Sequence, residues 1–226
     1  MRATVLSFVG AVLISMPVLA QTSVKLNAAT SPTSGQAGLT TVSVSGSGFP
    51  SGTISPASVT VTLTPSGGTA VTTTATGVTP GTGTTDTIAF LAPASISVST
   101  PTVYAVSISG QTTTGTAFQS SNSSNLTINP PSSITSISPT TGLQGQTISV
   151  TINGKYTNFV SGVTQANFGP NISVGGASPG ANGLVGVVSA TKATANIVIG
   201  NTAAVGSYDV TVVPARKRRR WPMASR

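Results

Sequence analysis

Residues 147–152 read TISVTI, a run in which apolar Ile and Val alternate with the hydroxyl residues Thr and Ser. The same alternation recurs in residues 41–45 (TVSVS) and 58–63 (SVTVTL). Successive side chains of a strand point to opposite faces of a sheet, so each run predicts a half-buried β-strand. Val, Ile and Thr are β-branched, which favours a strand over a helix. These runs predict an all-β fold.

Turn signals separate the alternating runs. Examples are Ser66-Gly67-Gly68, Pro80-Gly81 and Asn153-Gly154, where Gly, Pro and Asn favour a change of chain direction. Short strands at intervals of about 8–12 residues, with no helical pattern between them, favour β-sandwiches over any alternating α/β fold.

A repeat divides the chain into two similar parts. Residues 31–38 (SPTSGQAG) return as residues 138–145 (SPTTGLQG), and both copies lead into an alternating strand with a predicted turn at Gly46 or Gly154. Near the ends of the copies, residues 104–108 (YAVSI) match residues 208–212 (YDVTV). Similar openings and closings at a spacing of about 105 residues predict two tandem copies of one β-sandwich domain.

The predicted boundary lies in residues 129–133 (NPPSS), because two prolines cannot donate sheet hydrogen bonds and they stiffen a connection. We therefore expect domain 1 at residues 21–131 and domain 2 at residues 132–214. The first copy carries an additional piece, residues 110–127, interpreted as a further strand pair or as a long loop followed by a strand at residues 125–128.

Residues 1–20 have the pattern of a secretory signal peptide. Arg2 supplies a positive charge, an apolar run follows, and Val18 and Ala20 are small residues at the −3 and −1 positions before Gln21. The apolar run is shorter than the ~20 residues that a membrane-spanning helix needs. We expect cleavage before Gln21, no transmembrane segment in the mature chain, and a secreted, cell-envelope or cell-surface location.

The composition excludes many kinds of catalysis. The chain has 38 Thr and 32 Ser among 226 residues but only two acids, Asp86 and Asp209, and it has no Cys or His. Disulfides, Cys or His zinc sites and catalytic triads that need His are thereby ruled out. The prediction is a non-enzyme with no catalytic, cofactor-binding or metal-binding residues and no cofactor.

The net charge of +8 is concentrated in a C-terminal tail. Six of the ten basic residues lie within residues 215–226 (ARKRRRWPMASR), and the rest of the mature chain carries a net charge of only +1. A nearly neutral body does not predict a specific nucleic-acid partner. Two interpretations of the tail stay open: a polybasic arm for anionic polymers, and a truncation or frameshift product of a longer reading frame.

Residues 134–142 (ITSISPTTG) followed by Gly145-Gln146-Thr147 resemble the start of an IPT/TIG domain, the immunoglobulin-like fold shared by plexins and some transcription factors. Residues 159–170 and 204–212 are similar to the version found in repetitive exported bacterial proteins. The resemblance covers residues 132–213 well and residues 24–110 loosely. It implies a sandwich of about seven strands that occurs in strings on secreted or surface proteins.

Few side chains suggest a binding site. The aromatic residues Phe49, Phe90, Phe118, Phe159 and Phe168 are predicted to lie in the cores rather than on a platform for sugars. Tyr104 and Tyr208 should point inward with their hydroxyl groups at the rim, and Tyr156 and Trp221 should be exposed. The Thr-rich residues 71–76 are predicted to form an edge strand rather than a flat binding array. A Lys–Asn isopeptide bond would need a buried acid beside Lys25, Lys155 or Lys192, and Asp209 is predicted to face solvent.

The function predicted from the sequence is an exported, non-enzymatic structural or adhesive module built from tandem β-sandwiches. One alternative is a carbohydrate-binding accessory module. A second is a fragment of a larger extracellular hydrolase or surface repeat protein. The partner is unidentified, with a surface glycan or another envelope protein as the candidates.

Overall fold

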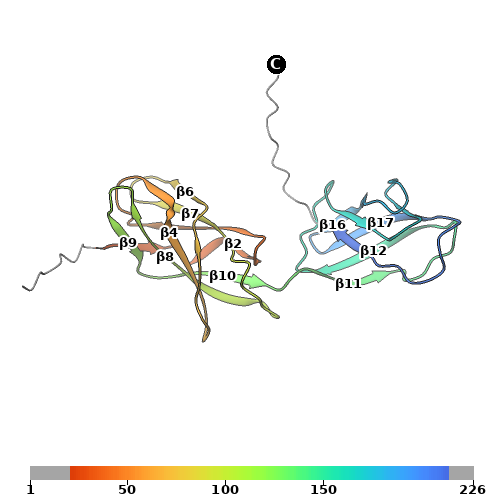
Figure 1. Cartoon of the computed structure of the whole chain (residues 1–226), viewed down its shortest axis with the longest axis horizontal. Helices are drawn as coiled ribbons and strands as arrows, with labels where there is room; N and C mark the ends of the chain where they lie inside the picture. The colour runs from red at the N-terminus through yellow and green to blue at the C-terminus, as the bar shows by residue number, and fades with distance from the viewer. Residues whose placement is uncertain (1–20, 214–226) are drawn as a thin grey trace, which may run out of the picture. The chain divides into compact units, whose positions relative to one another are not determined.

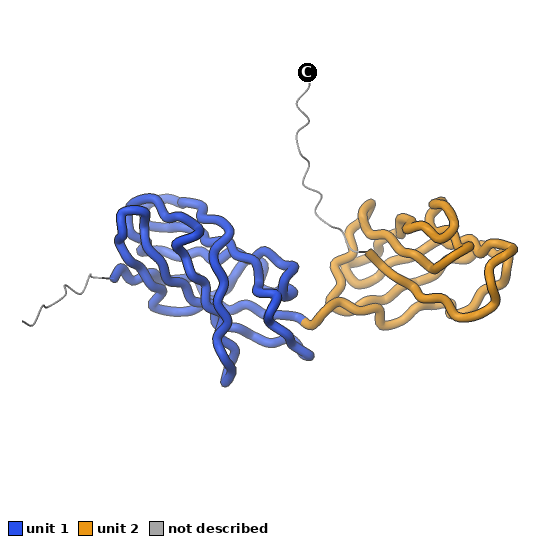
Figure 2. Tube along the Cα trace, viewed as in Figure 1, with its two compact units in different colours: residues 1–129 blue, residues 130–226 orange. Residues whose placement is uncertain are grey.

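The structure is a computed structural model that describes residues 21–213. These residues form eighteen β-strands and no helix, which confirms the predicted all-β fold (Figure 1). No helix in this described range is long and apolar enough to cross a membrane. The chain divides into two compact units between Asn129 and Pro130 (Figure 2). Each unit is described by itself below, as unit 1 and unit 2.

Unit 1 is a sandwich of two mostly antiparallel sheets. The strands of one sheet are β4 (Ile54–Pro65), β5 (Val71–Thr74), β8 (Thr102–Thr112), β9 (Ala117–Ser120) and β10 (Ser124–Asn129). The strands of the other sheet are β3 (Thr41–Ser47), β6 (Gly77–Pro80) and β7 (Asp86–Leu91). The first two strands of the chain, β1 (Thr22–Leu26) and β2 (Ala29–Gln36), pair with strands of both sheets.

The core of unit 1 is formed by the inward residues of the alternating runs. Val42 and Val44 on β3 belong to the same buried cluster as Val61 and Leu63 on β4, and none of these four side chains is exposed. Phe49, which lies in a loop, and Phe118 on β9 also belong to this core, and their rings meet edge to face with centroids 5.5 Å apart. The period-two pattern thus places each apolar side chain between the sheets.

Strand β10 closes the open edge of unit 1. It runs antiparallel to β8 and parallel to β2, so it joins the two strands that would otherwise be separated. Leu126 and Ile128 on this strand point into the core and are fully buried, whereas Asn125 on the opposite face of the strand is exposed. The additional piece noted in the sequence therefore contains two strands, β9 and β10, and the second of them fills part of the core.

Unit 2 is a smaller sandwich. One sheet contains β11 (Ser133–Ser138), β12 (Thr147–Lys155), β14 (Ile172–Val174), β16 (Gly186–Ser189) and β17 (Lys192–Ile199). The other contains β13 (Gln165–Asn167), β15 (Gly183–Leu184) and β18 (Thr211–Val213). Val150 and Ile152 on β12 pack with Ala195 on β17 and with the buried Phe159 and Phe168.

Two local predictions are wrong. Asn153-Gly154 is not a turn, because both residues belong to β12 and pair with β11. The chain leaves the strand one residue after Lys155, at Tyr156, which has a φ of 56°. A side chain at position 154 would meet that of Thr157 at 2.6 Å, so the glycine serves close packing rather than a turn. Gly46 likewise lies inside β3.

The last strand of unit 2, β18, is shorter than the matching strand β8 of unit 1. Only residues 211–213 pair with a neighbour, β13, whereas residues 208–210 lie outside any strand. In unit 1 the matching residues 104–106 pair along their whole length with β4 on one side and β10 on the other. The difference at this edge creates the site described next.

Candidate functional site: an apolar groove in unit 2

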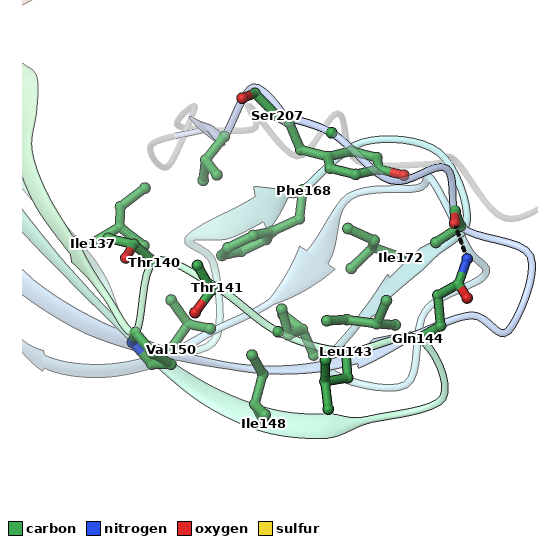
Figure 3. Close-up of a pocket in the computed structure, with 18 of the residues that line it drawn as sticks. Ile137, Thr140, Thr141, Leu143, Gln144, Ile148, Val150, Phe168, Ile172 and Ser207 are labelled. Atoms are coloured by element: carbon green, nitrogen blue, oxygen red, sulfur yellow. Dashed lines mark hydrogen bonds between the residues drawn. The ribbon is translucent and has the colours of Figure 1, made fainter.

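A groove of about 670 Å³ opens in unit 2 between residues 139–144 and residues 203–210. Its floor includes Ile148, Ile172 and Ile197 from one sheet, together with Phe168, which directly follows β13 of the other sheet. Figure 3 shows the side chains of Phe168, Ile172 and Ile148 directed into this space. The groove therefore gives direct access to the hydrophobic core of unit 2.

The rims of the groove are apolar or hydroxyl-bearing except at Gln144, which carries an amide, and no residue that lines the groove is charged. Leu143 on one rim is 75% exposed and Val205 on the other is 95% exposed. The Gln144 amide donates to the carbonyl oxygen of Ala203 at 2.6 Å and links the two rims at one end (Figure 3). The Tyr208 hydroxyl donates to the carbonyl oxygen of Ala204 at 2.7 Å. These two bonds fix the rim that carries residues 203–208.

The matching residues of unit 1 are more deeply buried than those of unit 2. Tyr104, Val106 and Ile108 of β8 are 6%, 0% and 1% exposed. The corresponding residues of unit 2, Tyr208, Val210 and Val212, also pack against the core of their unit but are only partly buried. The repeat thus places similar side chains in both units, but the described residues of unit 2 cover this edge less completely.

Strand β10 accounts for the difference. In unit 1 it lies between β8 and β2, opposite residues that include Tyr104 and Gly35. In the part of unit 2 that the structure describes, β18 pairs only with β13, and residues 139–143 belong to no strand. The groove therefore lies where a counterpart of β10 would lie.

The predicted positions of the aromatic residues are largely confirmed. All five phenylalanines named from the sequence are buried, with exposed fractions of 6% or less: Phe49, Phe90, Phe118, Phe159 and Phe168. Tyr104 points into the core, and Tyr208 places its hydroxyl at the rim. Tyr156 is half-buried rather than exposed, and the Lys155 ammonium lies 5.2 Å from its ring centroid. Trp221 lies outside the described residues.

The remaining sequence candidates are not brought together. Residues 71–74 form β5, whose only pairing among the described strands is with β4, so the predicted edge strand is confirmed. The three lysines of the described residues, Lys25, Lys155 and Lys192, are all exposed. Asp209 is also exposed, and Asp86 is half-buried. Residues 21–213 hold no group of three or more acidic, His or Cys side chains arranged to bind a metal.

The groove was not predicted from the sequence. The sequence nevertheless contains a sign of it. In the first copy the YAVSI residues 104–108 are followed by residues 110–127, whereas no equivalent of that piece occurs in the second copy up to Val213. That piece was interpreted as an addition to unit 1. The structure shows that it supplies a strand of the sandwich itself.

Searches with models of known protein families and against curated proteins give no match. Several solved structures are similar to this chain, and three of them are described here. The extracellular region of plexin A4 is 11% identical, with a TM-score of 0.37 over 86% of this chain and 15% of its own. A tetra-tandem repeat from the extending region of a large adhesion protein is 13% identical, with a TM-score of 0.31 over 86% of this chain and 49% of its own.

The third similar structure belongs to a bacterial ice-binding adhesin described as retained on the host cell surface. It is 17% identical, with a TM-score of 0.27 over 85% of this chain and 62% of its own. The chain thus spans less than two thirds of the length of each of these three proteins. Its assignment as two β-sandwiches rests on the strand pairing described above.

Proposed function

We propose that this chain is an exported, non-enzymatic structural or adhesive module made of two IPT/TIG-like β-sandwiches. The observation that carries the proposal is that two consecutive sandwiches, nearly neutral in charge and rich in Ser and Thr, follow a signal-peptide pattern. Tandem sandwiches act as spacers and as carriers of binding surfaces, because each repeat adds length without changing the fold of its neighbour.

Export is the first expected result. When the chain is produced with its own N-terminus, we expect a mature protein that begins at Gln21, because Val18 and Ala20 satisfy the peptidase's need for small residues. Mass spectrometry of the N-terminal peptide, combined with protease treatment of intact cells, measures both cleavage and surface exposure. A species that retains Met1 and is protected inside the cell would contradict the proposal.

We also propose that residues 21–131 and 132–214 are separate folding domains. The buried side chains form two clusters, one confined to each unit, so each unit has a core of its own. A fragment of residues 132–214 is expected to fold alone, with dispersed amide resonances in its NMR spectrum and a far-UV circular dichroism spectrum of β-structure. If the amide resonances of this fragment were poorly dispersed while those of residues 21–131 were well dispersed, unit 2 would need unit 1 in order to fold.

A carbohydrate-binding accessory module is the main alternative. Sugar sites commonly use exposed aromatic faces together with polar groups, whereas the aromatic rings within residues 21–213 are buried or half-buried. Binding of the mature chain to a glycan array would favour this alternative. The flanking DNA tests the third possibility, since a catalytic domain encoded beyond Arg226 in another frame would favour a hydrolase fragment, and further sandwich repeats would favour an adhesin.

A further inference from the structure

The apolar groove of unit 2 has the shape and the chemistry of a site for one more β-strand. We propose that it binds an extended polypeptide segment of a partner protein, in the position that β10 occupies in unit 1. The segment would be uncharged, with apolar side chains at every second position. The inference concerns unit 2 alone and does not depend on the function proposed above.

The strand register of unit 1 indicates how such a segment would lie. On β10, Leu126 is opposite Tyr104 of β8, and Ile128 is opposite Gly35 of β2. The sequence repeat carries Tyr104 to Tyr208 and Gly35 to Gly142, and both of these residues line the groove. An incoming strand in the same register would therefore place one apolar side chain beside Tyr208 and the next beside Gly142.

The groove offers both kinds of contact that strand addition needs. Among the described strands, one edge of β18 has no neighbour, and residues 139–143 run along the other side of the groove outside any strand. Backbone groups on an unpaired edge give affinity, and pockets for alternate side chains give specificity. Here the pocket is the floor formed by Phe168, Ile172 and Ile197. Burial of two apolar side chains on this floor would cover core residues that are now accessible.

Charge argues against occupation by the chain's own C-terminal residues. Thirteen residues follow Val213. Trp221 and Met223 alternate there, but Pro222 between them cannot donate a sheet hydrogen bond, and the five residues at positions 216–220 are all basic. The groove has no charged lining residue to pair with them, and burial of an unpaired charge is costly. A second copy could supply β10 only by removing Leu126 and Ile128 from the core of its own unit 1. A partner's segment requires neither cost.

A synthetic peptide of residues 122–129 (NSSNLTIN), labelled with a fluorophore, is a direct probe of the groove. We expect saturable binding to the mature full-length chain in fluorescence anisotropy. Amide resonances of residues 140–143 and 208–213 should shift in the NMR spectrum, and those of unit 1 should not. A peptide with Leu126→Ser and Ile128→Ser should bind at least about tenfold more weakly, because each apolar side chain contributes through burial.

Matched controls distinguish binding in the groove from nonspecific hydrophobic binding. A peptide with Asn125→Ser and Thr127→Ser changes only the outward positions of β10 and should bind as well as the original. In the protein, Val210→Asn places an amide in the groove and should abolish binding, whereas Asp209→Asn changes an exposed neighbour and should not. The peptide pair keeps the test valid even if Val210→Asn proves unfolded by circular dichroism.

Several results would overturn the proposal. The absence of saturable binding, or equal binding of the Leu126→Ser, Ile128→Ser peptide, would show that the groove accepts no strand. Binding that appears only after deletion of residues 214–226 would identify the chain's own tail as the occupant. Dimers that form with rising protein concentration and are dissociated by the peptide would identify a second copy instead of a partner protein.

Discussion

Leu126→Ala is expected to lower the free energy of unfolding of unit 1 by about 2–5 kcal/mol, the range for buried Leu-to-Ala changes in tightly packed cores. Leu126 is fully buried on β10 and lies opposite Tyr104, on a strand that has no counterpart among the described strands of unit 2. The substitution would leave a cavity at the edge of the sandwich that β10 closes. Hydrogen exchange of the β8 amides measures the loss in unit 1 separately from unit 2.

The matched control for this substitution is Asn125→Ala, which changes an exposed neighbour on the same strand. We expect the control to alter stability by no more than about 0.5 kcal/mol, because its side chain makes no core contact. If Leu126→Ala were as mild as the control, β10 would be an accessory strand. The comparison between the two units, on which the groove in unit 2 depends, would then lose its basis.

Deletion of residues 215–226 is expected to abolish retention of the mature chain on heparin. The deletion lowers the formal net charge of the mature chain from +7 to +1, which leaves three lysines and two aspartates. Polyanion binding grows with the number of cations that displace counterions, so affinity carried by the tail should also fall steeply with salt. Heparin chromatography of the two proteins over a salt gradient measures the difference.

The melting temperature provides the control for the tail deletion. It should change by no more than about 1–2 °C, because exposed charges without partners contribute little to folding. Lys25, Lys155 and Lys192 are exposed but lie on separate strands or strand ends. Retention of the shortened protein at physiological salt would require a basic surface that these three residues form together, and a large loss of melting temperature would make the tail part of the folded structure.

The alternating runs allowed most strands and the core to be predicted from the sequence. The reason is physical: with few aromatic residues and few charges, burial of Val and Ile on one face of each strand is the main source of stability available. The same simplicity placed the five phenylalanines in the cores. It also made Asn153-Gly154 misleading, because a local turn preference was outweighed by seven pairings between β12 and β17.

The groove could not be predicted in the same way, because it arises from pairing between residues distant in sequence. Nothing local in residues 139–143 distinguishes them from residues 32–36, which form part of β2. Their state depends on whether a strand such as β10 lies beside them. Comparison of the two copies held the information, since residues 110–127 occur in only one of them, but its meaning depended on the register between β10, β8 and β2.

The parallel pairing of β2 with β10 also determines how unit 1 responds to mechanical tension. Strands near the two ends of the unit lie side by side and point the same way, so a force that pulls those ends apart slides one strand along the other. Several hydrogen bonds between them then carry the load together and must break at nearly the same time, unlike the successive opening of a hairpin. The described strands of unit 2 include no parallel pair, so the same set of hydrogen bonds does not carry load there. Unit 2 would therefore extend before unit 1 under tension.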